Sequence, residues 1–159
     1  MEKKEFLNFL KGYFKSHGFE KGKGNRYYRN SLEHEFLCEI FFYKSLYGDF
    51  YYFDCKFFLG AFKKPYIINR ESHQTYTPYV GTRFVFDDKS CPAFCKYSEY
   101  SQEYFEKMLD ENMNRIVHAP FFMGKKYLRE NYASPQTEKK IYLTFLSEER
   151  VLPLLLDET

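Results

Sequence analysis

The stretch from Glu35 to Gly60, EFLCEIFFYKSLYGDFYYFDCKFFLG, decides the fold of this chain. Successive side chains of a strand point to opposite faces, so every second residue shares a face. Every second residue is apolar in both arms of this stretch, at even positions in the first arm and at odd positions in the second. These residues are Phe36, Cys38, Ile40 and Phe42, followed by Tyr51, Phe53, Cys55, Phe57 and Leu59.

A four-residue connection, 46–49, joins the two arms. With a four-residue connection, the numbers of two residues that face each other across the strands add up to an odd number. Even-numbered residues of the first arm therefore face odd-numbered residues of the second arm, so both apolar sets lie on the same face. Gly48 is expected to take a positive φ in this turn, since glycine does so without steric cost. Pattern and turn agree, and together they predict one β-hairpin with one wholly apolar face.

Around this hairpin the sequence predicts a single α+β domain over residues 1–159. It has an N-terminal helix, an antiparallel sheet of about four strands, and C-terminal helices packed on the sheet. Apolar residues at three- and four-residue spacing predict the first helix over 3–16, and Gly18 is the expected stop.

The remaining elements follow from shorter patterns. Strands are expected at 25–29 and 82–86, with a long loop at 61–81. A helix capped by Ser98 or Ser101 is expected to reach about His118, and a short helical segment to span 121–132. The last segment, 134–146, has a helix-start signal, although the alternation near its end leaves a strand open.

The composition is unusually rich in aromatic residues. They make up 22% of the 159 residues, with 19 Phe, 16 Tyr and no Trp. A surplus of tyrosine favours a recognition surface, although codon bias explains the same excess. Net charge is +2, but residues 1–30 hold eight Lys/Arg against three Glu. This basic region could meet phosphates or an acidic partner, or could be a solvated face.

A cytoplasmic location is expected. The N-terminus has no apolar core of the kind found in secretory signals, and no apolar run is long enough to span a membrane. Cys38 and Cys55 are expected about four residues out of register, roughly 13 Å apart. That distance exceeds disulfide reach, so both are predicted to be buried free thiols. The spacing of Cys91 and Cys95 does not suit a zinc site, and no metal is expected.

No catalytic signature is found. The chain has no Gly-x-Ser-x-Gly, no His-Glu-x-x-His and no phosphate-binding Walker loop. The sequence therefore predicts a protein that is not an enzyme, with no catalytic residues and no cofactor.

Three short motifs resemble a known family. They are Gly18-Phe19-x-Lys21, then Asn25-Arg26-Tyr27-Tyr28-Arg29, then Lys44-Ser45-x-Tyr47-Gly48-x-Phe50-Tyr51. Together they resemble the bacterial family called domain of unknown function 4304, over about residues 5–60. The resemblance implies a helix packed on an antiparallel sheet with further helices behind it, and no established activity. The chain departs from the family at Tyr43, where glutamine is expected, and at Cys55-Lys56, where a small residue is usual.

Three functions remain after these exclusions. The favoured one is a non-catalytic interaction protein that binds and modulates or inhibits another macromolecule. Toxin-immunity proteins and phage inhibitors of nucleases such as Cas9 are examples. The second is a small-ligand domain or enzyme that uses the cleft between sheet and helices, with Arg26, Arg29 and Arg83 as anion holders. The third is nucleic-acid binding through the basic N-terminal region and stacking tyrosines. No membrane partner is expected.

The second face of the hairpin is the candidate partner-binding site. It alternates large rings with Glu39, Asp54 and Lys56, a composition that suits a contact surface better than a core. The predicted partner-binding residues are Phe41, Tyr43 and Tyr52, flanked by Arg26 and Arg29. The alternative is that the C-terminal helices fold over this face and make it a second core layer.

Overall fold

The computed structural model describes residues 1–31, 33, 36–68, 77–87, 89, 91–132, 142, 151 and 153–155. Five antiparallel strands form one sheet in the order β1-β2-β3-β4-β5. They are β1 (Glu20–Lys21), β2 (Arg26–Ser31), β3 (Phe36–Lys44), β4 (Tyr51–Leu59) and β5 (Tyr79–Arg83). The predicted α+β class is confirmed, and the additional strand is the short β1, which pairs with Tyr27 and Tyr28.

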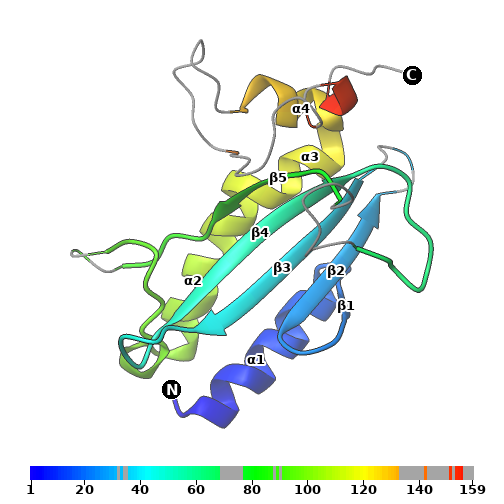
Figure 1. The fold of residues 1–159 in the computed structure, drawn as a ribbon. Coiled ribbons are helices and arrows are strands. Elements are labelled where there is room, and N and C mark those ends of the chain that lie inside the picture. Colours follow the sequence, from blue (N-terminus) through cyan, green and yellow to red (C-terminus); the bar gives the residue numbers. More distant parts are fainter. Residues whose placement is uncertain are drawn as a thin grey trace.

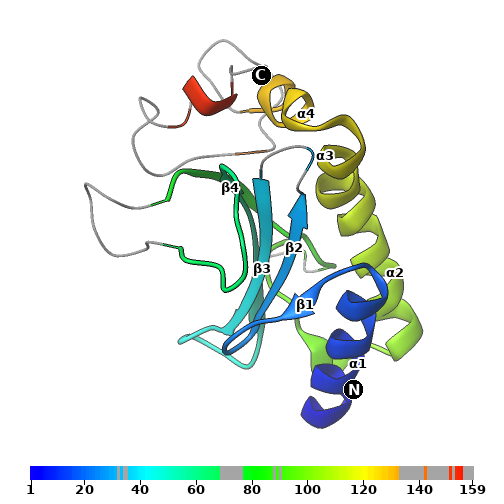
Figure 2. The same cartoon turned by 90° about the vertical axis from the view of Figure 1, so that its right-hand side faces the viewer.

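The helices follow the sheet, apart from the first one. They are α1 (Lys3–Ser16), the 3-10 turn η1 (Tyr97–Glu99), α2 (Gln102–Asn112), the π-helical turn η2 (Met113–Val117), α3 (His118–Met123) and α4 (Lys125–Glu130). Figure 1 shows the sheet in front of the helices, and Figure 2 shows all the labelled helices on one side of it. The described helices and the sheet therefore form two layers, and none of the labelled helices lies on the other face of the sheet.

The predicted hairpin register is confirmed. Phe36 lies opposite Leu59, Phe42 opposite Phe53, and Lys44 opposite Tyr51. The ladder extends one step further, since the Ser45 N–H donates to the Phe50 carbonyl at 2.9 Å. Gly48 does not take a positive φ, so that expectation is wrong. A Cβ at this position would lie 2.6 Å from the Phe50 ring, and this close approach is why a glycine fits here.

The apolar face of the hairpin is the core of the protein, as predicted. Its side chains are buried against the helices, with Phe6 of α1 at the centre. The Phe6 ring stacks on Tyr97 at 4.4 Å and lies 5.3 Å from Tyr51. The Tyr13 hydroxyl donates to Asp110 at 2.6 Å and so ties α1 to α2. Gly18 has φ 84°, which is the expected left-handed end of α1.

The helix after the sheet also begins where one of the two proposed caps lies. Ser101 is the N-cap of α2, and its hydroxyl accepts from the Tyr104 N–H at 3.1 Å. Asn112, at the other end, is almost wholly buried and bonds both backbone groups of Val85 at 2.8 Å. This polar clamp fastens α2 to the chain just after β5.

Several element boundaries differ from the sequence prediction. The strand expected at 25–29 is β2, Arg26–Ser31, and the helix expected to reach about His118 ends as α2 at Asn112, after which η2 begins. The last strand runs over Tyr79–Arg83 rather than 82–86, because its ladder with β4 begins at Tyr79 opposite Phe58. The segment predicted over 121–132 is two short helices, α3 and α4, which meet at Gly124 with φ 75°. The predicted element at 134–146 lies outside the described residues apart from Tyr142. Within the described part of the chain, no helix is both long and apolar enough to cross a bilayer.

Candidate functional site

The sheet face away from the helices, here called the outer face, is organised in rows that cross the strands. One row runs Arg26, Phe41, Asp54 and Arg83, from β2 to β5. The row beside it is the pair Tyr43 and Tyr52. These two rows contain four of the five residues predicted as partner-binding, and all four are half-buried.

Arginines lie against the rings of these rows. The Arg26 guanidinium lies over the Phe41 ring at 4.0 Å, and that of Arg83 lies over the Tyr52 ring at 4.6 Å. The rings also contact each other, with centroid distances of 5.1 Å for Phe41–Tyr43 and 5.5 Å for Tyr43–Tyr52. Such cation–π and cross-strand aromatic contacts hold rings in place without burying them.

Phe94 extends this surface, and the sequence prediction missed it. Its ring stacks on Phe50 at 3.8 Å and meets the edge of Tyr52 at 5.6 Å. A bridge between Tyr51 and Cys95 brings it there, with backbone hydrogen bonds of 2.9 and 3.1 Å. The segment 87–97 has no strand pattern, so only the three-dimensional pairing reveals the contact. We call Arg26, Phe41, Tyr43, Tyr52 and Phe94 the aromatic patch.

Arg29 does not lie on this face, so its predicted place beside the patch is wrong. It is three residues from Arg26, and an odd spacing on a strand puts two side chains on opposite faces. Arg29 lies opposite Cys38 of the core face, and its guanidinium lies over the Phe121 ring of α3 at 4.0 Å. The three arginines proposed as anion holders therefore do not gather at one site.

The outer face is covered at one end and open at the other. Leu37 and Phe58, which face each other across β3 and β4, are buried although they point away from the helices. The segment after β4 returns on this side: the Asn30 amide donates to the Phe62 carbonyl at 2.9 Å, and Tyr66 lies 5.7 Å from Tyr28. Figure 2 shows this segment on the side of the sheet opposite the helices.

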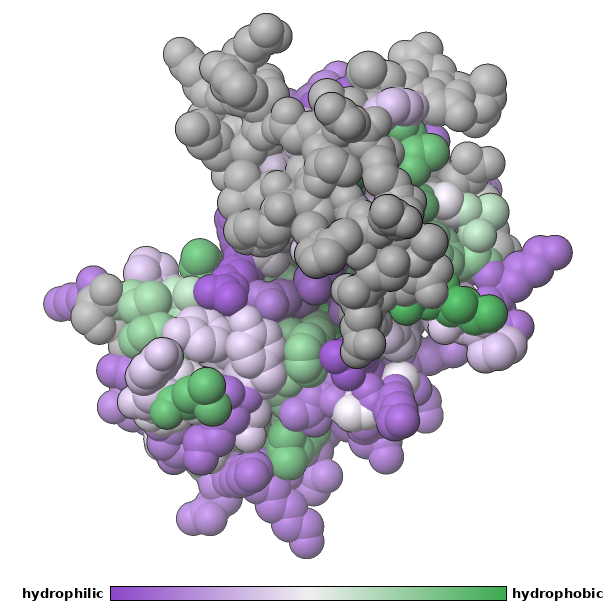
Figure 3. All heavy atoms as spheres, viewed as in Figure 1, coloured by the Kyte–Doolittle hydropathy of each residue, from purple (hydrophilic) through white to green (hydrophobic). Residues whose placement is uncertain are grey.

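The described helices do not cover the aromatic patch. Side chains of α1, α2, η2 and α4 join the core on the other face of the sheet. The expectation that C-terminal helices make the outer face a second core layer is therefore wrong for α2, α3 and α4. Figure 3 looks onto the outer face and shows hydrophobic, intermediate and hydrophilic side chains side by side over its lower part.

Asp54 and Arg83 form an ion pair beside the rings of the aromatic patch. The Arg83 Nε donates to Asp54 Oδ1 at 2.9 Å, and another nitrogen of its guanidinium donates to the Tyr43 hydroxyl at 2.8 Å. Burial lowers the pKa of Arg83, but the hydrogen bond and charge of Asp54, together with Tyr43, outweigh burial and raise the pKa overall. Burial and then Asp54 raise the pKa of Tyr43. With both pKa values raised, Arg83 stays protonated and Tyr43 stays neutral at physiological pH.

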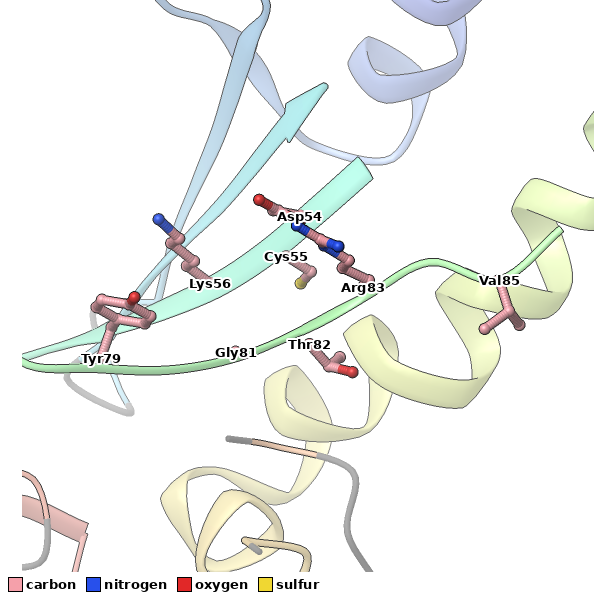
Figure 4. A pocket seen from close by; sticks show the side chains of 8 residues that line it. All are labelled: Asp54, Cys55, Lys56, Tyr79, Gly81, Thr82, Arg83 and Val85. Atoms are coloured by element: carbon pink, nitrogen blue, oxygen red, sulfur yellow. The ribbon is translucent and has the colours of Figure 1, made fainter. Parts of the chain in front are cut away.

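A cavity of about 490 Å³ lies beside β4 and β5 (Figure 4). Asp54 and Arg83 lie close together at one end of it, and Lys56 and Tyr79 at the other. The Lys56 ammonium lies 4.8 Å from the centre of the Tyr79 ring. Gly81 stands between these pairs, and a Cβ there would approach the Cys55 carbonyl to 2.7 Å. Because glycine has no side chain, β4 and β5 lie close together here and the cavity is not filled.

The cysteines are free, but one predicted distance is wrong. Cys38 and Cys55 are offset by two residues in the register, not four, and their Sγ atoms lie 3.8 Å apart. They are diagonal neighbours on one face, fully buried, and burial raises the pKa of the Cys38 thiol well above its ordinary value. Cys91 and Cys95 are also unbridged. Among the described residues, no group of three or more His, Cys, Asp and Glu could hold a metal ion.

Comparison with family models, curated proteins and solved structures finds no match for this chain. The resemblance to the domain of unknown function 4304 therefore stays a prediction.

Proposed function

We propose that the chain is a non-catalytic interaction protein that binds another protein through the aromatic patch and modulates or inhibits it. Toxin-immunity proteins and phage inhibitors of nucleases such as Cas9 are examples of proteins that inhibit by binding. The observation that carries the proposal is the ladder of half-buried rings on the open sheet face, with arginines stacked against it. Tyrosine and arginine around an aromatic centre are the residues most enriched among interface hot spots.

The patch also indicates what the partner should present. Its rings call for apolar or aromatic side chains, because edge and face contacts between rings add to area burial. Arg26 lies at its rim, and its Nε is buried without a hydrogen-bond partner among the described residues, 4.0 Å from Glu39. Because 28% of the Arg26 side chain is exposed, a carbonyl or carboxylate of the partner can approach its guanidinium from the solvent side.

The test begins by isolating the partner. The tagged chain is used as bait in a lysate of its host, the captured protein is purified, and binding is measured by isothermal titration. Capture alone does not support the proposal. The double variant Tyr43→Ala, Tyr52→Ala should weaken binding at least about thirtyfold, since a hot-spot residue contributes about 2 kcal/mol or more.

Phe122 offers a matched control. It is a large apolar residue on α3, 85% exposed and outside the patch, so Phe122→Ala should leave the affinity unchanged. The melting temperature separates loss of contact from loss of fold, and the double variant should lower it by no more than about 4 °C. Unchanged affinity of the double variant would refute the proposal. An equal loss of affinity in the double variant and in Phe122→Ala would also refute it.

We place this interaction in the cytoplasm. The four unbridged cysteines fit a reducing compartment, above all the buried pair Cys38 and Cys55, whose sulfur atoms are already close. In protein whose thiols are blocked at cell lysis, mass measurement with and without reductant should show no disulfide among these cysteines.

A small-ligand function is the second candidate, carried by the cavity beside β4 and β5. It presents a cation, an ion pair and a ring within one hollow, which is a common arrangement in sites for small polar molecules. A thermal-shift screen of anionic and zwitterionic metabolites tests it, with Lys56→Met as the variant. A stabilisation that Lys56→Met abolishes would support this function.

A further inference from the structure

A second cavity, of about 470 Å³, lies at the opposite edge of the sheet. It is formed by the turn after α1, by β2, and by the segment that follows β4. The segment is fastened to β2 by the hydrogen bond from the Asn30 amide to the Phe62 carbonyl. The lining residues are Gly18, Glu20, Tyr28, Arg29, Asn30, Phe62, Lys63, Lys64 and Tyr66.

The walls of this cavity are basic. Residues 15–31 and 62–66 contain seven Lys/Arg and one acidic residue, Glu20. Glu20 forms an exposed ion pair with Lys64, so its charge is balanced. Lys63 is exposed, and among the described residues it has no ion-pair partner. The cavity therefore carries excess positive charge from two segments far apart in sequence.

Arg29 is the most buried of the cationic residues that line this cavity. Within the part of the chain that the structure describes, no carboxylate lies within ion-pair distance of it. Its hydrogen bond to the His17 carbonyl is long, at 3.4 Å. By contrast, the guanidinium of Arg83 is bonded to Asp54 and Tyr43. Arg29 thus holds a half-buried guanidinium, stacked on Phe121, with several donors left for an anion.

The described residues around Arg29 supply no anion that would balance its charge. His17 and His118 stack on each other at 5.7 Å, between the end of α1 and the start of α3. Burial lowers the pKa of His118, and then His17 and Arg29 lower it further, while Asp110 raises it. Asp110 already accepts a hydrogen bond from Tyr13, so it is engaged elsewhere.

Two tyrosines supply the second kind of contact. The rings of Tyr28 and Tyr66 lie 5.7 Å apart at an angle of 50°, on strand β2 and on the segment after β4. Tilted rings beside cations are the combination by which proteins hold nucleotides, since the ring stacks on the base and the cation binds the phosphate.

We propose that this cavity binds a nucleotide unit across the edge of the sheet, with its phosphate on Arg29 and Lys63 and its base against Tyr28 and Tyr66, since Arg29 and Tyr28 point to opposite faces of β2. The unit can be a free nucleotide or part of a single strand, because both present the same phosphate and base. This site is separate from the aromatic patch, and it assigns a location to the basic charge of the first thirty residues.

Binding is tested with three probes on the full chain: inorganic phosphate, ADP, and a fluorescein-labelled 15-residue oligothymidylate. Calorimetry serves for the first two, and fluorescence anisotropy at two salt concentrations for the third. Binding of ADP with competition by phosphate indicates a free nucleotide, and binding of the oligonucleotide alone indicates a single strand. Either result supports the site, whereas no binding of any probe at about 1 mM overturns it.

The variants separate a site from general positive charge. Tyr66→Ala should weaken binding about fivefold or more, because stacking of one base contributes that much. Lys63→Glu should weaken it about tenfold and lower the salt dependence by about 0.7 for the lost phosphate contact. Lys107→Glu, the same charge change on an exposed residue of α2, should change affinity less than about twofold. Equal losses for Lys63→Glu and Lys107→Glu overturn the proposal.

The pKa of His118 gives a readout that does not depend on affinity. An anion on Arg29 offsets the positive charge of this guanidinium, which lowers the pKa of His118, so bound ADP should raise that pKa in an NMR titration. An unchanged His118 pKa on saturation places the ligand elsewhere and contradicts the assignment. The variant Tyr43→Ala, Tyr52→Ala should bind ADP as the wild type does, so the two proposals can fail separately.

Discussion

The two faces of the hairpin β3–β4 differ in composition and in burial, although both belong to the same strands. The inner face is apolar throughout and buried against the helices. The outer face mixes rings with charges: Leu37, Glu39 and Phe58 are buried on it, whereas Phe41 and Tyr52 are only half-buried. The difference shows that one face specifies the fold by excluding water, while the other can carry charges and remain available for contact.

Glu39 combines features of the two faces. It points to the outer face yet is fully buried, and Arg26 lies 4.0 Å away. A buried carboxylate is tolerated only with compensating partners. The outer face is therefore not simply a solvated surface, and the following changes measure how far the two faces differ.

The largest effect is expected on the inner face. Phe53 is fully buried, and its ring contacts Phe6, Phe42, Phe84 and Phe86. Phe53→Ala should lower the free energy of unfolding by about 3–5 kcal/mol, because it removes contacts and leaves a cavity. Urea denaturation measures this change. A cost below about 1 kcal/mol would contradict the description of this face as the core.

The polar clamp between α2 and the chain after β5 comes next. Asn112→Ala leaves both backbone groups of Val85 without their partner, so it should cost about 1–3 kcal/mol. Asn114→Ala, an exposed neighbour on η2, should stay within about 0.5 kcal/mol of the wild type. Equal stabilities of the two variants would show that the clamp contributes nothing.

The outer face should respond far less. Phe41→Ala removes a half-buried ring and its contact with Arg26, so it should cost about 0.2–1 kcal/mol. Arg83→Ala breaks a partly exposed ion pair, for which a similar value is expected. Urea denaturation of Phe41→Ala and Arg83→Ala, measured together with Phe53→Ala, compares the two faces directly. A loss of several kcal/mol for Phe41→Ala would show that the patch is core.

The smallest effect concerns acid. The pKa of His118 is lowered in the folded protein, first by burial, so folding favours its neutral form. The unfolded chain then binds more protons than the folded one, and this contribution to stability is fully present above about pH 6.5. It is lost as pH falls from there through the lowered pKa. Melting curves from pH 7 to 5 should fall less steeply for His118→Gln than for the wild type.

Much of the inner face was determined by the sequence alone. Alternation of apolar residues is a local property of the strand, so it predicted the register of Phe36 with Leu59 and the buried set around Phe53. The same ladder places Arg29 away from Arg26 and Cys38 close to Cys55, and these two predictions failed although the information was present. The stop at Gly18 and the cap at Ser101 were also local, since each depends on its own side chain and backbone.

The outer face and the basic cavity were decided only by the tertiary structure. Phe94 reaches Tyr52, and Tyr66 reaches Tyr28, through segments that have no periodic pattern. Their positions depend on long-range contacts such as the Tyr51–Cys95 bridge and the Asn30–Phe62 hydrogen bond. A short-period pattern records which way a side chain points. It does not record which distant segment arrives to cover it, because that depends on the geometry of the whole assembled chain.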